Sequence, residues 1–164
     1  MALKMATQQL GRLFACLVAL TTWDVDFAQA GACPADKVLT TPRDIGDHKN
    51  HLVTKKTLTV VNLHGWRNIV DLNLRERYFT IPAGGVVPTH DHEDRPSIVH
   101  VLKGQIYEHS SLCSVPILHK AGDTTPEFGK GHSHWWKNEG PEEVILTSSD
   151  VVETGQLDSP MPDM

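Results

Sequence analysis

Two histidines separated by one residue, His90 and His92, lie in the glycine-bounded segment 84–104. On an extended strand, alternate side chains project from the same face, so the two imidazoles would lie side by side. Two imidazoles placed in this way can bind one transition metal together. A third histidine, His134, follows on a later segment. A half-site on each of two strands is typical of a metal centre inside a β-barrel.

This segment resembles the first sequence motif of the cupin family, G-x5-H-x-H-x3/4-E-x6-G. Four residues stand at the spacings of the motif: Gly84, His90, His92 and Gly104. The position of the family's glutamate ligand is taken by Ser97. A serine hydroxyl is a poor ligand for a divalent cation beside imidazoles. The resemblance therefore implies three neutral histidine ligands and open coordination positions for water, substrate or dioxygen.

A looser resemblance to the second cupin motif, G-x5-P-x-G-x2-H-x3-N, comes from Gly122, His134 and Asn138, with one extra residue allowed. The spacing to Asn138 favours His134 over His132 as the third ligand. The two motifs together cover roughly residues 70–153. They imply an all-β fold, a cupin-type jelly-roll β-barrel of two packed antiparallel sheets, with the three histidines on one divalent metal.

The implied function is that of a metal-dependent enzyme acting on a small polar molecule, with oxygenase or lyase/isomerase chemistry. Analogy with three-histidine cupins such as cysteine dioxygenase favours Fe²⁺, while Zn²⁺ and Mn²⁺ fit equally well from the residues. Fold alone does not fix function, so two alternatives stay open. One is a non-catalytic ligand-binding or sensory module, and the other is a structural or metal-storing barrel.

Short runs of β-branched and aromatic residues predict strands, because Gly and Pro turn signals separate them and no run shows a helical period. The predicted strands are Thr57–Asn62, Arg75–Ile81, Ser97–Leu102 and Val144–Thr147. Many short strands joined by such turns are typical of a sandwich or barrel. The expected domain organisation is an N-terminal arm with one strand (31–55), a cupin barrel (56–153) and a flexible tail (154–164).

The N-terminus has the features of a secretory signal peptide. Lys4 and Arg12 precede the apolar run Leu13–Leu20, and an A-x-A cleavage signal ends at Ala30. The run is too short to span a bilayer. We expect residues 1–30 to be removed and the protein to be exported, to the periplasm or outside the cell. A lipoprotein anchored through Cys33 is the alternative.

Export would leave two cysteines, Cys33 and Cys113, in an oxidising compartment. They form either two free thiols or a disulfide that ties the arm to the barrel. The net charge of −5 argues against nucleic acid or an anionic membrane as partner. The expected partner is a small-molecule ligand or substrate, and a homodimer is possible.

Three residues near the motifs are candidates for proton transfer: Glu127, Glu108 and His109. Glu127 lies near the second motif and is also the carboxylate best placed to reach the metal. Glu108 and His109 follow the Gly104 turn and could instead orient the metal ligands.

Three further residues are candidates for substrate binding: Arg95, Arg77 and Trp135. Either arginine could bind a substrate carboxylate at the mouth of the barrel. Ion pairs on the surface are the plainer alternative for both. Trp135 and Trp136 should face opposite sides of their strand, so that one of them packs near the metal.

Overall fold

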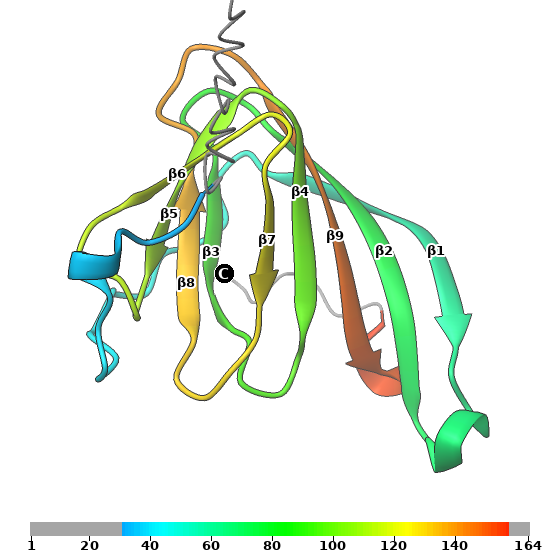
Figure 1. Cartoon of the computed structure of the whole chain (residues 1–164). Coiled ribbons are helices and arrows are strands. Elements are labelled where there is room, and N and C mark those ends of the chain that lie inside the picture. The colour runs from blue at the N-terminus through cyan, green and yellow to red at the C-terminus, as the bar shows by residue number, and fades with distance from the viewer. Residues whose placement is uncertain (1–30, 158–164) are drawn as a thin grey trace, which may run out of the picture.

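The computed structural model describes residues 31–157, so the predicted signal peptide and most of the predicted tail lie outside the described residues. Nine β-strands form two antiparallel sheets within this range (Figure 1). The first sheet has the order β1-β2-β9-β4-β7, and the second has the order β3-β8-β5-β6. The strands are β1 (Thr54–Asn62), β2 (Leu72–Ile81), β3 (Val86–Asp91), β4 (Ser97–Lys103), β5 (Gln105–Ser110), β6 (Ile117–Lys120), β7 (Thr124–Glu127), β8 (Ser133–Lys137) and β9 (Val144–Glu153).

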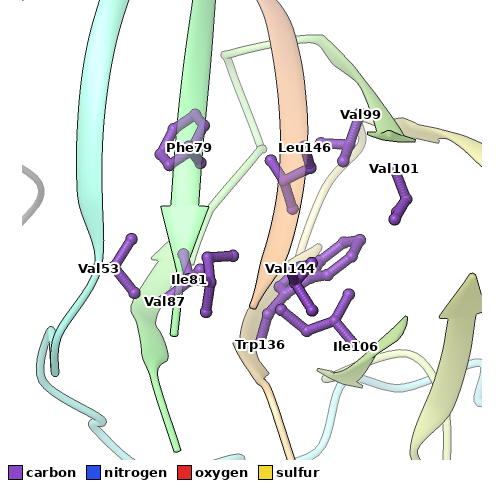
Figure 2. Close-up of a cluster of buried hydrophobic side chains, with 10 residues drawn as sticks. All are labelled: Val53, Phe79, Ile81, Val87, Val99, Val101, Ile106, Trp136, Val144 and Leu146. Atoms are coloured by element: carbon purple, nitrogen blue, oxygen red, sulfur yellow. The ribbon is translucent and has the colours of Figure 1, made fainter. Parts of the chain in front are cut away.

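Alternating burial along the strands turns one face of each sheet towards the other. Along β2 the inward positions begin with Asn73, Arg75 and Arg77 and continue with Phe79 and Ile81. The same change occurs in β9, so one end of the space between the sheets is apolar and the other end is polar. Figure 2 shows the apolar end, where side chains from both sheets and from Val53 of the arm pack together.

All four predicted strands are confirmed, and each of them extends further than the sequence indicated. β9 runs to Glu153. The sequence indicated only its first part, because the inward Ser148 and Asp150 are polar and interrupt the apolar pattern before Val152. The all-β architecture of two packed antiparallel sheets is also confirmed. None of the short helices within residues 31–157 is long and apolar enough to cross a membrane.

The arm that precedes β1 lies against the second sheet without forming the predicted strand. Its ladder contacts are two isolated bridges, Val38 with Cys113 and His51 with Val86. A disulfide joins Cys33 to Cys113, with an S–S distance of 2.00 Å. The arm is therefore fixed to the barrel covalently as well as by hydrogen bonds.

Candidate metal centre and cavity

Strands β3 and β8 bring the three predicted histidine ligands together. His90 and His134 are direct cross-strand partners, and their Nε2 atoms lie 3.1 Å apart. His92 comes immediately after β3, where its backbone N–H donates to the carbonyl of His132. One nitrogen from each ring lies within 4.8 Å of the other two. The H-x-H spacing and the later histidine thus meet at one point between the sheets.

The three rings have their Nδ1 atoms occupied and their Nε2 atoms turned inward. His90 Nδ1 is 2.8 Å from the carbonyl of Pro88, and His92 Nδ1 is 2.9 Å from the carbonyl of Arg95. A carbonyl only accepts, so each Nδ1 carries the proton and each Nε2 keeps its lone pair. Two Nε2 lone pairs at 3.1 Å repel one another unless a cation lies between them.

In the third ring, His134, the Nδ1 atom also faces an acceptor, which here is a carboxylate. Its Nδ1 is 2.9 Å from Oε1 of Glu108 and 3.1 Å from the indole nitrogen of Trp136. A buried carboxylate needs donors more than an indole needs an acceptor, so Nδ1 donates its proton to Glu108. The Nε2 lone pair of His134 then faces the other two histidines.

Glu127 supplies a carboxylate to the same point, although the motif position holds a serine. Ser97 on β4 and Glu127 on β7 are direct cross-strand partners, and the Ser97 hydroxyl donates to Glu127 Oε2 at 2.6 Å. The two carboxylate oxygens lie 3.2 Å from His92 Nε2 and 3.7 Å from His134 Nε2. Glu127 is therefore a candidate carboxylate ligand beside the three predicted histidines, whose ring nitrogens form the cluster within 4.8 Å. The carboxylate thus comes from the neighbouring strand β7 and not from the motif position on β4, and the Ser97 hydroxyl orients it.

The polar atoms left over at this point fit a divalent metal. Among the described residues 31–157, His92 Nε2 and Glu127 Oε1 are buried without a hydrogen-bond partner. Unpaired buried polar atoms are rare because each costs a desolvation penalty. Three imidazoles and one carboxylate form a donor set that suits Zn²⁺, Mn²⁺ or Fe²⁺.

The protonation equilibria of the three histidines differ: two of the rings are held neutral, and the third is favoured in its protonated form. Burial, reinforced by the neighbouring imidazoles, holds the pKa of His90 well below its usual range. Burial and the charge of His134 lower the pKa of His92 to about 3. Burial also acts on His134, but the carboxylates of Glu127 and Glu108 outweigh it and raise the pKa of that ring. His90 and His92 are thus neutral bases, ready to bind a cation.

Glu108 lies behind the histidines and does not line the cavity. Its carboxylate bridges His134 and His119, whose Nε2 is 2.9 Å from Oε2. Burial opposes ionisation, yet hydrogen bonds from His119, His132 and His134 hold the pKa of Glu108 well below its usual range. These contacts match its second predicted role, orienting a ligand, and they give no support to its predicted role in proton transfer to a substrate.

Two predicted site residues lie on the outer face of the second sheet. Trp135 stacks between His48 and His109, with ring centroids 3.7 Å and 3.8 Å apart. Because side chains alternate along a strand, His134 and Trp136 point inward and Trp135 points away. This placement gives no support to the predicted roles of Trp135 in substrate binding and of His109 in proton transfer, since neither residue lines the cavity. Trp136 is the tryptophan that lines the cavity.

A cavity of about 610 Å³ extends from the histidines to the polar end of the first sheet. Both arginines predicted to bind substrate line it, together with Arg75 and Lys55. Arg77 Nη2 donates to Asp150 Oδ2 at 2.9 Å, and Arg95 Nη1 lies 3.7 Å from the same oxygen. The volume is typical of a site for a small molecule.

Sequence reasoning assigned no role at the site to three buried polar residues. Asp150 and Arg75 form the ion pair that organises the far wall, and His119 supports Glu108. The alternation of Arg75 and Arg77 with outward residues was visible in the sequence, but their acidic partner on β9 was not. No sequence pattern marked His119, since its contact with Glu108 forms only when β5 pairs with β6.

No family model and no curated protein matches the sequence. Several solved structures are similar to it. One is a double-stranded β-helix protein from Klebsiella pneumoniae, 18% identical with a TM-score of 0.49, where the match covers 70% of this chain and 84% of that one. A predicted oxalate decarboxylase from Thermotoga maritima is 23% identical over 74% of this chain and 98% of that chain, with a TM-score of 0.48. KdgF from Halomonas is 15% identical over 71% of this chain and 90% of its own, with a TM-score of 0.49.

These similarities concern architecture. The chain's own strand order and pairing give an all-β, jelly-roll fold of two packed antiparallel sheets. Its histidine and glutamate cluster could hold a divalent metal, as the distances and the unpaired atoms indicate.

Proposed function

We propose that the protein is a metal-dependent enzyme that acts on a small polar molecule bound in the cavity. One observation carries the proposal. Three Nε2 lone pairs, each fixed by an acceptor on Nδ1, face one point beside the buried carboxylate of Glu127. An ordinary packed core has no need of such an arrangement, and it leaves two buried polar atoms unpaired.

His90, His92, His134 and Glu127 would hold the metal, and Ser97 would orient the glutamate. A bound divalent ion supplies a Lewis acid that polarises an oxygen of the substrate. The chain's own residues bind and orient the substrate: Arg77 and Arg95 line one end of the cavity, and Trp136 lines it nearer the histidines.

The carboxylate bears on the identity of the metal. A neutral three-histidine set is the reason to favour Fe²⁺ by analogy with dioxygenases. With Glu127 present, Mn²⁺ and Zn²⁺ have an equal claim, because carboxylate and imidazole ligands suit all three. The oxygenase and the lyase/isomerase versions of the proposal both remain, and they differ in whether dioxygen is consumed.

Metal removal and reloading test the proposal. The protein is freed of metal by chelation, reloaded separately with Fe²⁺ under anaerobic conditions, Mn²⁺ or Zn²⁺, and mixed with a panel of small organic acids. We expect turnover with at least one metal. Oxygen consumption and mass spectrometry of the products measure it. The His92→Ala variant should be inactive with every metal. If the wild type bound no metal in stoichiometric amount, the proposal would be wrong.

A ligand-binding module is the second candidate, and one observation favours it. Two buried carboxylates at the cavity already accept hydrogen bonds: Glu127, which lines it, from Ser97, and Asp150, behind the lining, from Arg75 and Arg77. Neither stands apart as a proton-transfer group. A small molecule that is released unchanged on denaturation of the purified protein, with no turnover of that molecule by the loaded protein, would support this candidate over the enzyme.

We also propose that the protein is exported after cleavage at Ala30. The signal-like segment motivates the proposal, and the Cys33–Cys113 disulfide supports it because such bonds persist in oxidising compartments. The same bond uses the Cys33 thiol, which argues against a lipid anchor there. Mass spectrometry of protein from its own host should find an N-terminus at Gly31, and an intact Met1 on cytoplasmic protein would contradict export.

A further inference from the structure

A row of polar side chains crosses the inner face of the first sheet, from the histidines to the far wall of the cavity. Ser97 pairs with Glu127 on one side and with Asp150 on the other, and Asp150 pairs in turn with Arg75. Direct cross-strand partners point to the same face of a sheet. At about 4.8 Å for each strand, the backbones of Glu127 and Asp150 lie about 10 Å apart.

The far wall carries more positive than negative charge. Asp150 accepts from Arg75 through two hydrogen bonds, of 3.0 and 2.7 Å, and from Arg77 through one of 2.9 Å. Arg95 reaches the same carboxylate only at 3.7 Å. Three guanidinium groups face one carboxylate, so this group of four residues has a net charge of 3 − 1 = +2. Lys55, Asp91 and Asp94 also line the cavity, so the positive excess belongs to this group of four residues and not to the whole lining.

The wall also has unused hydrogen-bonding capacity. Among the described residues, Arg77 Nε is buried without a partner, and the residue is 7% exposed. The guanidinium of Arg95 donates one long hydrogen bond, of 3.4 Å, to the backbone carbonyl of Asp91, which engages one of its five N–H groups. Burial and the nearby arginines lower the pKa of Arg77 to about 10 and that of Lys55 to about 8. An anion placed among these groups would relieve their mutual repulsion.

We propose that Arg77 and Arg95 form a subsite that binds one carboxylate of a small organic acid. The oxygen-bearing group at the other end of that acid faces the histidines. The identification of the histidine end as the reacting end rests on the proposed function, but the anion subsite does not. A planar guanidinium fork matches a carboxylate. The distance along the row fits an acid with a few carbon atoms between its two polar ends, and the cavity of about 610 Å³ has room for one.

Binding of simple acids to the metal-free protein tests the subsite. The probes are the dicarboxylates from malonate to adipate, with their neutral diamides as controls, titrated by calorimetry and by NMR. We expect at least one dicarboxylate to bind and its diamide not to bind. Arg95→Met should weaken that binding about tenfold to a hundredfold, the usual loss for a charge-assisted hydrogen bond. Arg95→Lys should restore part of it.

Two controls separate the subsite from trivial effects. Lys103→Met removes one positive charge from an exposed surface pair with Glu143, and it should leave binding unchanged. The backbone carbonyl of Arg95, which anchors His92, is kept in Arg95→Met, and the variant removes a positive charge near the histidines, so metal affinity should not fall. If the wild type failed to bind metal, the proposed function would be wrong, but the dicarboxylate titration would still test the anion subsite.

Three results would overturn the inference. The first is that none of the dicarboxylates binds to the wild type at high millimolar concentration. The second is that Arg95→Met binds as tightly as the wild type, or that Lys103→Met loses as much affinity. The third is that inorganic phosphate binds more tightly than every dicarboxylate with the same dependence on Arg95, which would reject the assignment to a carboxylate.

Discussion

The two ends of the cavity differ in charge and in hydrogen-bonding character. At the histidine end, burial keeps His90 and His92 neutral, and their protons are held by nearby backbone carbonyls. At the arginine end, three cations share the single carboxylate of Asp150. One end offers lone pairs to a cation, and the other offers protons to an anion. The change of inward residues from one end to the other therefore gives one cavity two chemically different ends.

Breaking the arginine end should have the largest effect on stability. Asp150→Ala leaves Arg75 and Arg77 buried without their counter-ion, so we expect the free energy of unfolding to fall by about 3–5 kcal/mol. Denaturant unfolding measures the change. Glu143→Ala, which removes the partner of the exposed Lys103, is the matched control and should cost less than about 1 kcal/mol. A loss at Asp150 as small as at Glu143 would show that the far wall does not depend on this carboxylate.

Removing one imidazole at the histidine end should abolish metal binding with a smaller effect on the fold. His92→Ala deletes a buried Nε2 that faces the metal position, and we expect zinc affinity to fall by more than about a hundredfold, beyond the loss typical of a residue that only orients a ligand. His109→Ala, on the outer face of the same barrel, should bind zinc like the wild type. Equal losses in the two variants would argue against the inward cluster as the binding site.

The support behind the histidine end should matter less than the ligands themselves. Glu108→Gln keeps the size of the side chain and removes the charge that His134 and His119 bind. We expect metal affinity to fall about tenfold to a hundredfold, as measured by competition with a zinc chelator. Glu139→Gln makes the same replacement at an exposed position and serves as control. An unchanged affinity for Glu108→Gln would mean that the backbone alone orients His134.

Acid should destabilise the metal-free protein through the histidine end. The pKa of His92 is about 3 in the folded protein against an ordinary value of 6.5, so the unfolded chain binds a proton more readily. Stability should therefore fall as the pH drops from 6.5 towards 3. The raised pKa of His134 opposes this trend only in part, because His90 acts in the same direction as His92. His92→Gln should flatten the dependence measured by urea unfolding, and an unchanged slope would contradict the assignment.

The sequence predicted the histidine end better than the arginine end because the two depend on different kinds of information. The H-x-H spacing is local, since strand geometry alone places His90 and His92 on one face. The arginine end depends on the pairing of β2 with β9, which joins Arg75 to Asp150 across 75 positions of the chain. No local pattern reports such a pairing.

The same reasoning explains where the structure places site residues differently from the sequence-based expectation. Ser97 by itself indicates the loss of an acid, because Glu127 becomes its neighbour only when β4 pairs with β7. Trp135 and His109 are candidates only through their closeness in sequence to His134 and Glu108. Alternation along β8 and β5 turns both of them to the outer face, where they stack on one another.

The structure of the protein loaded with a divalent metal tests the central claim most directly. The account predicts one ion with Nε2 of His90, His92 and His134 and an oxygen of Glu127 at about 2.0–2.2 Å. Ser97 should still donate to the glutamate. An ion held instead by Glu108, His132 and His134, the other cluster of suitable atoms among the described residues, would contradict the account. So would an ion held by the three histidines alone, with Glu127 turned away.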